Sequence, residues 1–261
     1  GLIGDPSGRD DERNLNTKDV VGSWVESLRA QVGRFLDFDG NNPAVICNNL
    51  DWTEKLDVVS FLRDIGKHFS VNGMIQRESV KARLDREGQG ISYTEFSYML
   101  LQAMDFLELA RREDCLIQIG GSDQWGNIVS GIDLVRRHLG KEAFALTMPL
   151  VTKSDGTKFG KSASGAIWLD AQKTSPYSFY QFWLNTADAD VEPFLKLFTF
   201  LTEEEVAALA RETQDHPELR EGQRRLAHEV TQLVHGEEAL KSAERISECL
   251  FAGEVAGLQE V

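Results

Sequence analysis

The 261-residue chain has room for one large domain or two modest ones, and its hydrophobic fraction of 41% is ordinary for a globular protein. It carries 28 lysines and arginines against 42 aspartates and glutamates, a formal net charge of -14. This balance argues against a surface that follows nucleic acid throughout, although a local basic patch is compatible with it. The 3 widely separated cysteines form no CxxC pair, which favours free thiols in a reducing compartment over a disulfide framework or a zinc site.

No apolar run approaches the roughly eighteen residues of a membrane span. The charged segment after Ile3 is not typical of a signal peptide, so we expect a cytoplasmic protein with no membrane partner. The chain begins GLIGDPSG without an initiator methionine, a pattern typical of a strand that runs into a glycine turn. We therefore expect that an upstream part of the protein precedes this sequence.

The first half of the chain alternates between helical and extended patterns. Apolar residues at helical spacing predict a helix over residues 18–36, with Asn16 and Thr17 as capping residues. Residues 44–49 form a short apolar run that ends in polar residues, and residues 58–87 are expected to hold helices and loops with excess positive charge. The elements expected further along are a strong helix from Phe96, a buried strand from Cys115, a helix from Asn127, and strand-like segments from Phe144 and Ala166.

This alternation predicts an α/β fold with a largely parallel sheet covered by helices. At Thr174-Ser175-Pro176 a hydroxyl cap followed by proline marks a helix start, and the remaining sequence reads as helical. We therefore predict one domain over residues 1–175 and a small all-α domain over residues 176–261. The aromatic residues of 177–183 could form a platform for stacking bases, but we interpret them as the core of this helical domain.

The turn GDPSGRDDER places Asp5 in a Gly/Pro turn, followed by Arg9 and Arg13. Two arginines four residues apart on a helical turn can reach a common anion. Taken alone, this segment is explained somewhat better by an ordinary turn followed by a solvated helix start.

Tyr98, Gln102 and Asp105 form a polar stripe on an otherwise apolar helix. A stripe that simply faces water accounts for this pattern about as well as a pocket wall does. As a pocket wall, its phenol, amide and carboxylate suit a ligand that carries an ammonium group and a hydroxyl.

Two glycine-containing motifs follow predicted strands. GGSDQWGN places Asp123 and Gln124 at the carboxyl end of a strand, where open α/β sheets bind ligands, and its glycines allow close approach of the backbone. TKSDGTKFGKS, residues 152–162, concentrates lysine and glycine in an acidic chain. It is neither a Walker A loop nor GxGxxG, but it fits a loop that closes on phosphates as charge develops.

Together these motifs resemble the bacterial tyrosyl-tRNA synthetases, a family of class I aminoacyl-tRNA synthetases. The likeness extends over the whole chain through GDPSGR, LRDIGKHFSVN, TEFSYMLLQ, GGSDQWGN, KFGKS, YQFWLNTADAD and LVHGEEAL. It implies that residues 1–175 are part of a Rossmann-like catalytic domain with a helical connective insertion, and that KFGKS grips the pyrophosphate end of ATP.

By matching position, the resemblance implies three groups of site residues. The residues implied to bind tyrosine are Tyr98, Gln102, Asp105, Asp5, Asn49 and Gln124. The residues implied to bind ATP are Gly121, Asp123, Leu150, Val151 and Lys161. The residues implied to stabilise the pentavalent phosphorus and the leaving pyrophosphate are Lys158, Lys161, Ser162, Arg9 and Arg13.

Within these groups the resemblance gives individual roles. Asp5 would lie near the ammonium group of the substrate, and Asn49 would support the hydrogen-bond network of the pocket. Asp123 and Gly121 would meet the ribose, Gln124 the reacting carboxylate region, and the backbone at residues 150–151 the adenine.

The implied reaction activates L-tyrosine with ATP, without a covalent enzyme intermediate, and then transfers tyrosine to tRNA(Tyr). ATP is a substrate with Mg2+ expected on its phosphates, and neither a prosthetic group nor a protein metal site is expected. The resemblance also implies a homodimer formed through the region around Tyr93.

Two departures from the family pattern bear on activity. The HIGH-type histidine signature and a pocket tyrosine are expected upstream of Gly1, and an RNA-binding module is expected after Val261. HLGK at His138 is interpreted as a helix terminus. The resemblance therefore implies that residues 1–261 alone would be inactive.

Two other functions compete with this one. A non-catalytic, synthetase-like module could bind nucleotide or RNA, with the basic residues of 63–86 as an RNA face or merely a solvated one. Another adenylate-forming nucleotidyltransferase of similar fold is less compatible with the Tyr98, Gln102 and Asp105 triplet.

Overall fold

The structure is a computed structural model that describes residues 2–5, 16–77, 80–81, 84–85, 90–157, 159–162 and 165–252, with only the backbone described at 161, 162, 165 and 252. The chain separates into two compact units, Gly1–Leu150 and Val151–Val261. The expected domain boundary between residues 175 and 176 stays a prediction. The two compact units are defined by contacts between residues, whereas the predicted domains are defined by function.

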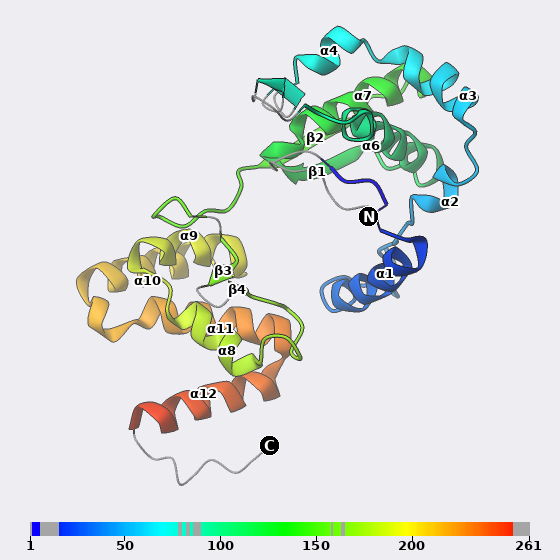
Figure 1. The fold of residues 1–261 in the computed structure, drawn as a ribbon. Helices are drawn as coiled ribbons and strands as arrows, with labels where there is room; N and C mark the ends of the chain where they lie inside the picture. The colour runs from blue at the N-terminus through cyan, green and yellow to red at the C-terminus, as the bar shows by residue number, and fades with distance from the viewer. Residues whose placement is uncertain are drawn as a thin grey trace. The chain divides into compact units, whose positions relative to one another are not determined.

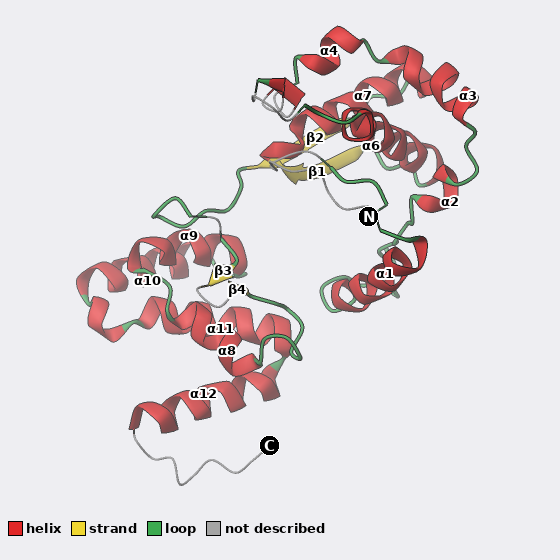
Figure 2. Cartoon of the chain, in the orientation of Figure 1, coloured by secondary structure: helices red, strands yellow, loops and turns green. Residues whose placement is uncertain are grey.

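A parallel pair of strands, β1 (Ile117–Gly121) and β2 (Phe144–Met148), lies in the first unit (Figures 1 and 2). Ile117 is opposite Phe144, and Gly121 is opposite Met148. Parallel strands need a long crossover, which the helix α7 (Trp125–Leu139) supplies. The helix ends at Gly140, whose φ of 64° is a left-handed conformation that glycine adopts without strain. The expectation of a parallel α/β sheet with helices is confirmed.

The core of the first unit lies between α7 and the helix α6 (Tyr93–Arg112). Phe106 and Leu107 from α6 are fully buried, as is Ile128 from α7. A Cβ at Gly131 would lie 2.8 Å from Cδ1 of Phe106, so the two helices approach closely because position 131 has no side chain. This close packing fixes the face of α6 that carries the polar stripe.

Shorter helices precede α6 along the chain. The first, α1 (Lys18–Val32), begins where the sequence predicts, because the Thr17 side chain caps the backbone N–H of Val20. The elements that follow are α2 (Leu50–Thr53), α3 (Val58–Ser60), the π-helix η1 (Phe61–Ile65), the 3₁₀ helix η2 (Gly66–His68) and α4 (Val71–Ile75).

The strand expected from Cys115 is present, but the expectation that it is buried is wrong. Ile117 is 59% exposed and Ile119 is 64% exposed. Successive side chains of a strand point to opposite faces of the sheet, and the described residues cover only the face that carries Gly120, where a Cβ would lie 3.4 Å from Cδ1 of Ile128 in α7. The sequence shows that a strand is apolar, but it does not show which face other elements cover.

The second unit is mainly helical, as predicted. Its first helix, α8 (Pro176–Leu184), begins where the sequence predicts, with Ser175 as the N-cap and proline as the first helical residue. Phe179, Tyr180 and Trp183 are buried, which confirms the core interpretation of the aromatic cluster. The helices that follow are α9 (Asp188–Phe198), α10 (Glu203–Asp215), the 3₁₀ helix η4 (Pro217–Leu219), α11 (Glu221–His235) and α12 (Glu237–Ala252).

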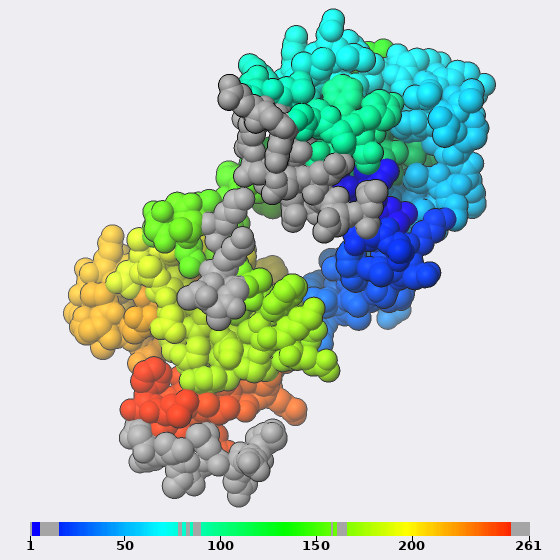
Figure 3. All heavy atoms as spheres, in the orientation of Figure 1, coloured from blue at the N-terminus to red at the C-terminus, as the bar shows by residue number. Residues whose placement is uncertain are grey.

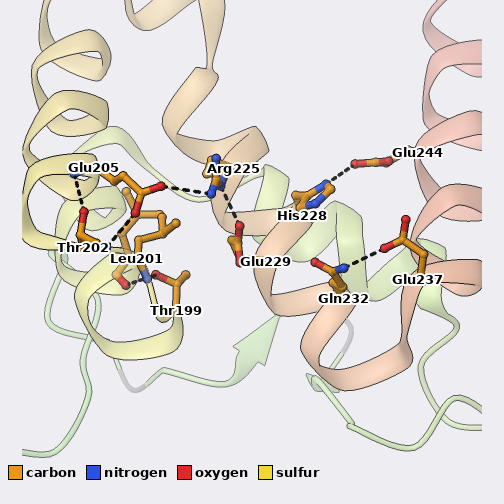
Figure 4. Close-up of polar contacts among 11 residues, drawn as sticks. Thr199, Leu201, Thr202, Glu205, Arg225, His228, Glu229, Gln232, Glu237 and Glu244 are labelled. Carbon is orange, nitrogen blue, oxygen red and sulfur yellow. Dashed lines mark hydrogen bonds and ion pairs between the residues drawn. The ribbon is translucent and has the colours of Figure 1, made fainter.

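Polar contacts fix the ends and the neighbours of these helices (Figure 4). Thr202 and Glu205 form a reciprocal capping box at the start of α10. His228 of α11 lies 2.9 Å from a carboxylate oxygen of Glu244 of α12. The space-filling view shows α12 lying against α8 (Figure 3). Among the residues described in this structure, no helix combines the length and apolar character needed to cross a membrane.

Candidate active site

The polar stripe of α6 lies at the edge of the core. Tyr98, Gln102 and Asp105 are each half-buried, whereas their neighbours Met104 and Phe106 are fully buried. The stripe therefore faces neither the packed interior nor open solvent. A half-buried row of phenol, amide and carboxylate groups provides the polar wall that a small ligand needs.

Asp105 is held by two donors from the start of α2. Nδ2 of Asn49 donates to Oδ2 of Asp105 at 2.9 Å, and Nε1 of Trp52 donates to Oδ1 at 2.8 Å. Burial raises the pKa of Asp105, and these two hydrogen bonds oppose that rise. A carboxylate offers about four acceptor positions, so Asp105 can accept a further hydrogen bond from a ligand hydroxyl.

Trp52 was not predicted as a site residue. Its indole reaches Asp105 across 53 positions of sequence, and an isolated tryptophan in a short helix reads as ordinary core. The sequence does contain a clue to this role, because Trp52 follows Asn49 by three residues. This spacing places both hydrogen-bond donors on one helical turn.

A second polar group lies at the carboxyl end of β1. Nε2 of Gln124 donates to Oδ2 of Asp5 at 2.8 Å and to Oδ2 of Asp123 at 3.1 Å. Nδ2 of Asn127 donates to Oε1 of Gln124 at 3.2 Å, which fixes the orientation of the amide. The structure thus brings Asp5 to the GGSDQWGN motif from 119 positions away. Two carboxylates at one strand end favour a ligand with ammonium or hydroxyl groups.

Two neighbouring side chains occupy the place that a side chain at Gly121 would take. A Cβ there would lie 2.5 Å from Oδ1 of Asp123 and 2.9 Å from Cδ2 of Leu150. A larger residue at position 121 would therefore have to displace the ends of these two side chains. Gly121, Asp123 and Leu150, which the family resemblance implies as ATP contacts, thus lie together.

The loop predicted to bind phosphates, residues 152–162, belongs to the second unit. The backbone of Lys161 and Ser162 forms the short strand β3 (Lys161–Ser162), which pairs antiparallel with β4 (Gly165–Ala166). Val151 packs against the core of the helices. Gly156 and Gly160 have φ values of 80° and 83°, where a residue with a side chain would be strained. The remaining predicted site residues, Lys158, Arg9 and Arg13, lie outside the described residues.

HLGK is a helix terminus, as interpreted. His138 lies in the last turn of α7, with its ring 5.0 Å from that of His68 in a T-shaped arrangement. Burial lowers the pKa of His138, and the neighbouring charge of Arg111 lowers it further. These surroundings are those of a packed structural histidine.

Comparison with known proteins agrees with this geometry. A family model described as "tRNA synthetases class I (W and Y)" matches residues 1–252. The tyrosine–tRNA ligase of Aliivibrio fischeri strain MJ11 is 62% identical over 261 residues, and that of Geobacillus stearothermophilus is 60% identical over 260 residues. The chain spans 61% of the length of each of these relatives.

A solved structure gives the same result. The C-terminally truncated mitochondrial tyrosyl-tRNA synthetase of Aspergillus nidulans has a TM-score of 0.79 at 31% identity, over 96% of this chain and 74% of that one. The α/β unit and the helical unit that follows it therefore have the fold of a class I synthetase. The chain belongs to the class I tRNA synthetases of the tryptophan and tyrosine family.

Proposed function

We propose that this chain carries most of the catalytic machinery of a tyrosine–tRNA ligase that acts in the cytoplasm. The observation that carries the proposal is the position of Asp105, whose carboxylate is held by Asn49 and Trp52 and can still accept a hydrogen bond. The phenolic hydroxyl of L-tyrosine would donate to it. Tyr98 and Gln102 extend the same half-buried face along the bound amino acid.

The ammonium group of tyrosine is the second element of recognition. Asp5 and Asp123 lie on either side of the Gln124 amide, and this pair of carboxylates suits a cation. Asp123 and the backbone at Gly121 would also meet the ribose of ATP. Leu150 and Val151 would contact the adenine through their backbone.

In the proposed reaction, a carboxylate oxygen of tyrosine forms a bond to the α-phosphorus of ATP while the bond to the β-phosphate oxygen breaks. Pyrophosphate leaves, and tyrosyl adenylate remains. The 3′-terminal ribose of tRNA(Tyr) then takes the tyrosyl group, and AMP leaves. Lys158, Lys161 and Ser162, with Arg9 and Arg13, would stabilise the charge that develops on the phosphates.

Mg2+ is expected on the phosphates of ATP, where it would neutralise charge. Within the described residues, no group of three or more His, Cys, Asp or Glu side chains could hold a metal ion. The roles given to the residues do not depend on this ion.

We also propose a homodimer formed through the region around Tyr93. Val58 is 73% exposed, and Val59 and Tyr93 are each 71% exposed. Side chains with this exposure are available for contact with a second copy of the chain. Tyr93→Asp should shift the sedimenting species from dimer to monomer, whereas unchanged sedimentation at micromolar concentration would contradict the assignment of this surface.

The experiment that tests the function is tyrosine-dependent exchange of pyrophosphate into ATP by the protein at its full natural length, followed by charging of tRNA(Tyr). The expected result is exchange with tyrosine and not with phenylalanine. A non-catalytic nucleotide- or RNA-binding module would bind ATP or RNA without exchange, and that outcome would replace the enzyme assignment.

A further inference from the structure

Phe159 stands between the two lysines of KFGKS and inserts its ring among four other aromatic rings. The ring centroid of Phe159 lies 5.9 Å from that of Phe182 and 5.4 Å from that of Trp183. It lies 5.0 Å from both Phe194 and Phe198, and it stacks on Phe198 with an interplanar angle of 26°. These separations are those of favourable aromatic pairs. We refer to Phe182, Trp183, Phe194 and Phe198 as the aromatic cage.

The cage is part of the rigid core of the helical unit. It combines rings from α8 and α9, and Trp183 and Phe194 are only 4% and 3% exposed. The cage rings also contact one another, with Trp183 and Phe198 at 5.0 Å. A ring that inserts here is therefore held by helices and not by the loop that carries it.

One backbone hydrogen bond joins the same segment to a helix, and two others join residues within the segment. The N–H of Ser154 donates at 2.6 Å to Oδ1 of Asp190, which lies in the first turn of α9 and is 5% exposed. The N–H of Phe159 donates to the carbonyl of Val151 at 3.3 Å, and that of Ile167 donates to the carbonyl of Gly160 at 3.1 Å. The loop predicted to bind phosphates is thus built onto the helical unit.

This attachment bears on the chemistry because Lys158 is bonded directly to Phe159, and Lys161 follows two residues later. Consecutive Cα atoms are only about 3.8 Å apart, so a shift of the Phe159 backbone moves both lysines. A misplacement of about 1 Å in a group that acts on the transition state can slow a reaction about 10²-fold.

We propose that Phe159 is a positioning residue for adenylate formation: its insertion into the aromatic cage lets the helical unit set the places of Lys158 and Lys161. The inference rests on the proposed function. It predicts that the ring is needed for the rate of the chemical step and not only for stability. A residue that serves packing alone would lower the melting temperature and leave the rate unchanged.

The test compares Phe159→Leu with Phe179→Leu in the protein at its full natural length. Phe179 is a matched control, because it is 1% exposed in the same core and packs against Trp183 and His235. Both variants should lower the melting temperature. Phe159→Leu should also slow single-turnover adenylate formation about 10-fold or more, with tyrosine affinity within about 2-fold of wild type, since the pocket residues for tyrosine lie elsewhere in the chain.

Two further variants make the result specific. Phe159→Met is a second variant without the ring. Its flexible side chain can fill an irregular gap in a core, so it should fold, and it should still slow the reaction. Phe159→Leu combined with Lys158→Ala and Lys161→Ala should slow the reaction little more than the two lysine changes alone, because the ring acts through those lysines.

The outcomes separate the two claims. A wild-type protein without tyrosine-dependent exchange would overturn the proposed function and this inference with it. If the wild type is active but the Phe159 and Phe179 variants form adenylate at equal rates, the inference alone is overturned. If Phe159→Leu slows the reaction equally in the presence and in the absence of the two lysines, the inference is likewise overturned.

Discussion

Asn49 donates a hydrogen bond of 2.9 Å to the carboxylate of Asp105, although 56 positions separate the two residues. Asp105 lies on α6, and Asn49 is the N-cap residue of the short helix α2. The contact fixes one carboxylate oxygen and therefore the direction from which a substrate hydroxyl can approach.

Selectivity for tyrosine over phenylalanine should depend on Asp105. A site built to hydrogen-bond a hydroxyl rejects an analogue without it by about 10⁴ to 10⁵, a range for which tyrosyl-tRNA synthetases are themselves the known example. Asp105→Ala should lower the ratio of the two kcat/KM values about 10-fold to 100-fold, the usual cost of one such bond. Asp133→Ala is the control, because Asp133 pairs with Arg136 and Arg137 on the surface of α7. Unchanged selectivity in the Asp105 variant would remove the residue from this role.

Tyrosine binding should depend on pH through the same carboxylate. Burial raises the pKa of Asp105 above its ordinary value of 3.8, so as the pH falls the charged acceptor is lost earlier than for an exposed aspartate. Affinity for tyrosine should therefore begin to fall at a pH above that value, and Asp105→Asn should remove this step. Titration by calorimetry across acidic pH measures it, and a profile shared by wild type and variant would exclude Asp105 as its source.

The contribution of Asp105 to the free energy of unfolding should change with pH in the opposite direction to tyrosine affinity. Because the folded state binds the Asp105 proton more tightly than the unfolded state does, the contribution of this group is present at low pH. It is lost as the pH rises from 3.8 through the raised pKa. Denaturant unfolding at a series of pH values should show this slope in wild type and not in Asp105→Asn, and parallel slopes in the two proteins would count against it.

The loop lysines should act on the rate and not on tyrosine binding. Lys158→Ala and Lys161→Ala should each slow adenylate formation about 10²-fold or more, the cost of losing one donor to a developing charge, with tyrosine affinity nearly intact. Pre-steady-state kinetics separate the two quantities. Normal rates with weakened tyrosine binding would give the loop a different task.

The sequence predicts the helices well because their ends are local. Thr17 and Ser175 cap the helices that follow them, and each cap depends on a few neighbouring residues. The exposure of Ile117 could not be predicted in this way, because it depends on which elements cover a sheet face. The same limit applies to Trp52 and Phe159, whose partners lie far along the chain.

The first residues of the candidate site, whose roles stay predictions, stand out in the sequence because they recur on one face of one helix. Tyr98 and Asp105 form a stripe that helical spacing alone reveals. The link from Asp5 to Gln124 needs the folded chain, since 119 positions separate them. Sequence reasoning thus finds residues that share an element and misses the contacts that join elements.

Trp52 should lower the pKa of Asp105 without determining the selectivity for tyrosine over phenylalanine. Trp52→Phe keeps most of the buried aromatic volume but removes the Nε1 donor, which lies 2.8 Å from Oδ1 of Asp105. Since a hydrogen bond to the charged form lowers the pKa of a carboxyl group, its loss should raise the pKa of Asp105 further. The fall in tyrosine affinity should then begin at a higher pH than in wild type, while phenylalanine is still rejected, because Asp105 and Asn49 remain in place. Trp24→Phe is the matched control, because Trp24 is 46% exposed on α1. Calorimetric titration of the three proteins with tyrosine at several pH values makes the comparison, and an unshifted profile for Trp52→Phe would show that the indole serves packing alone.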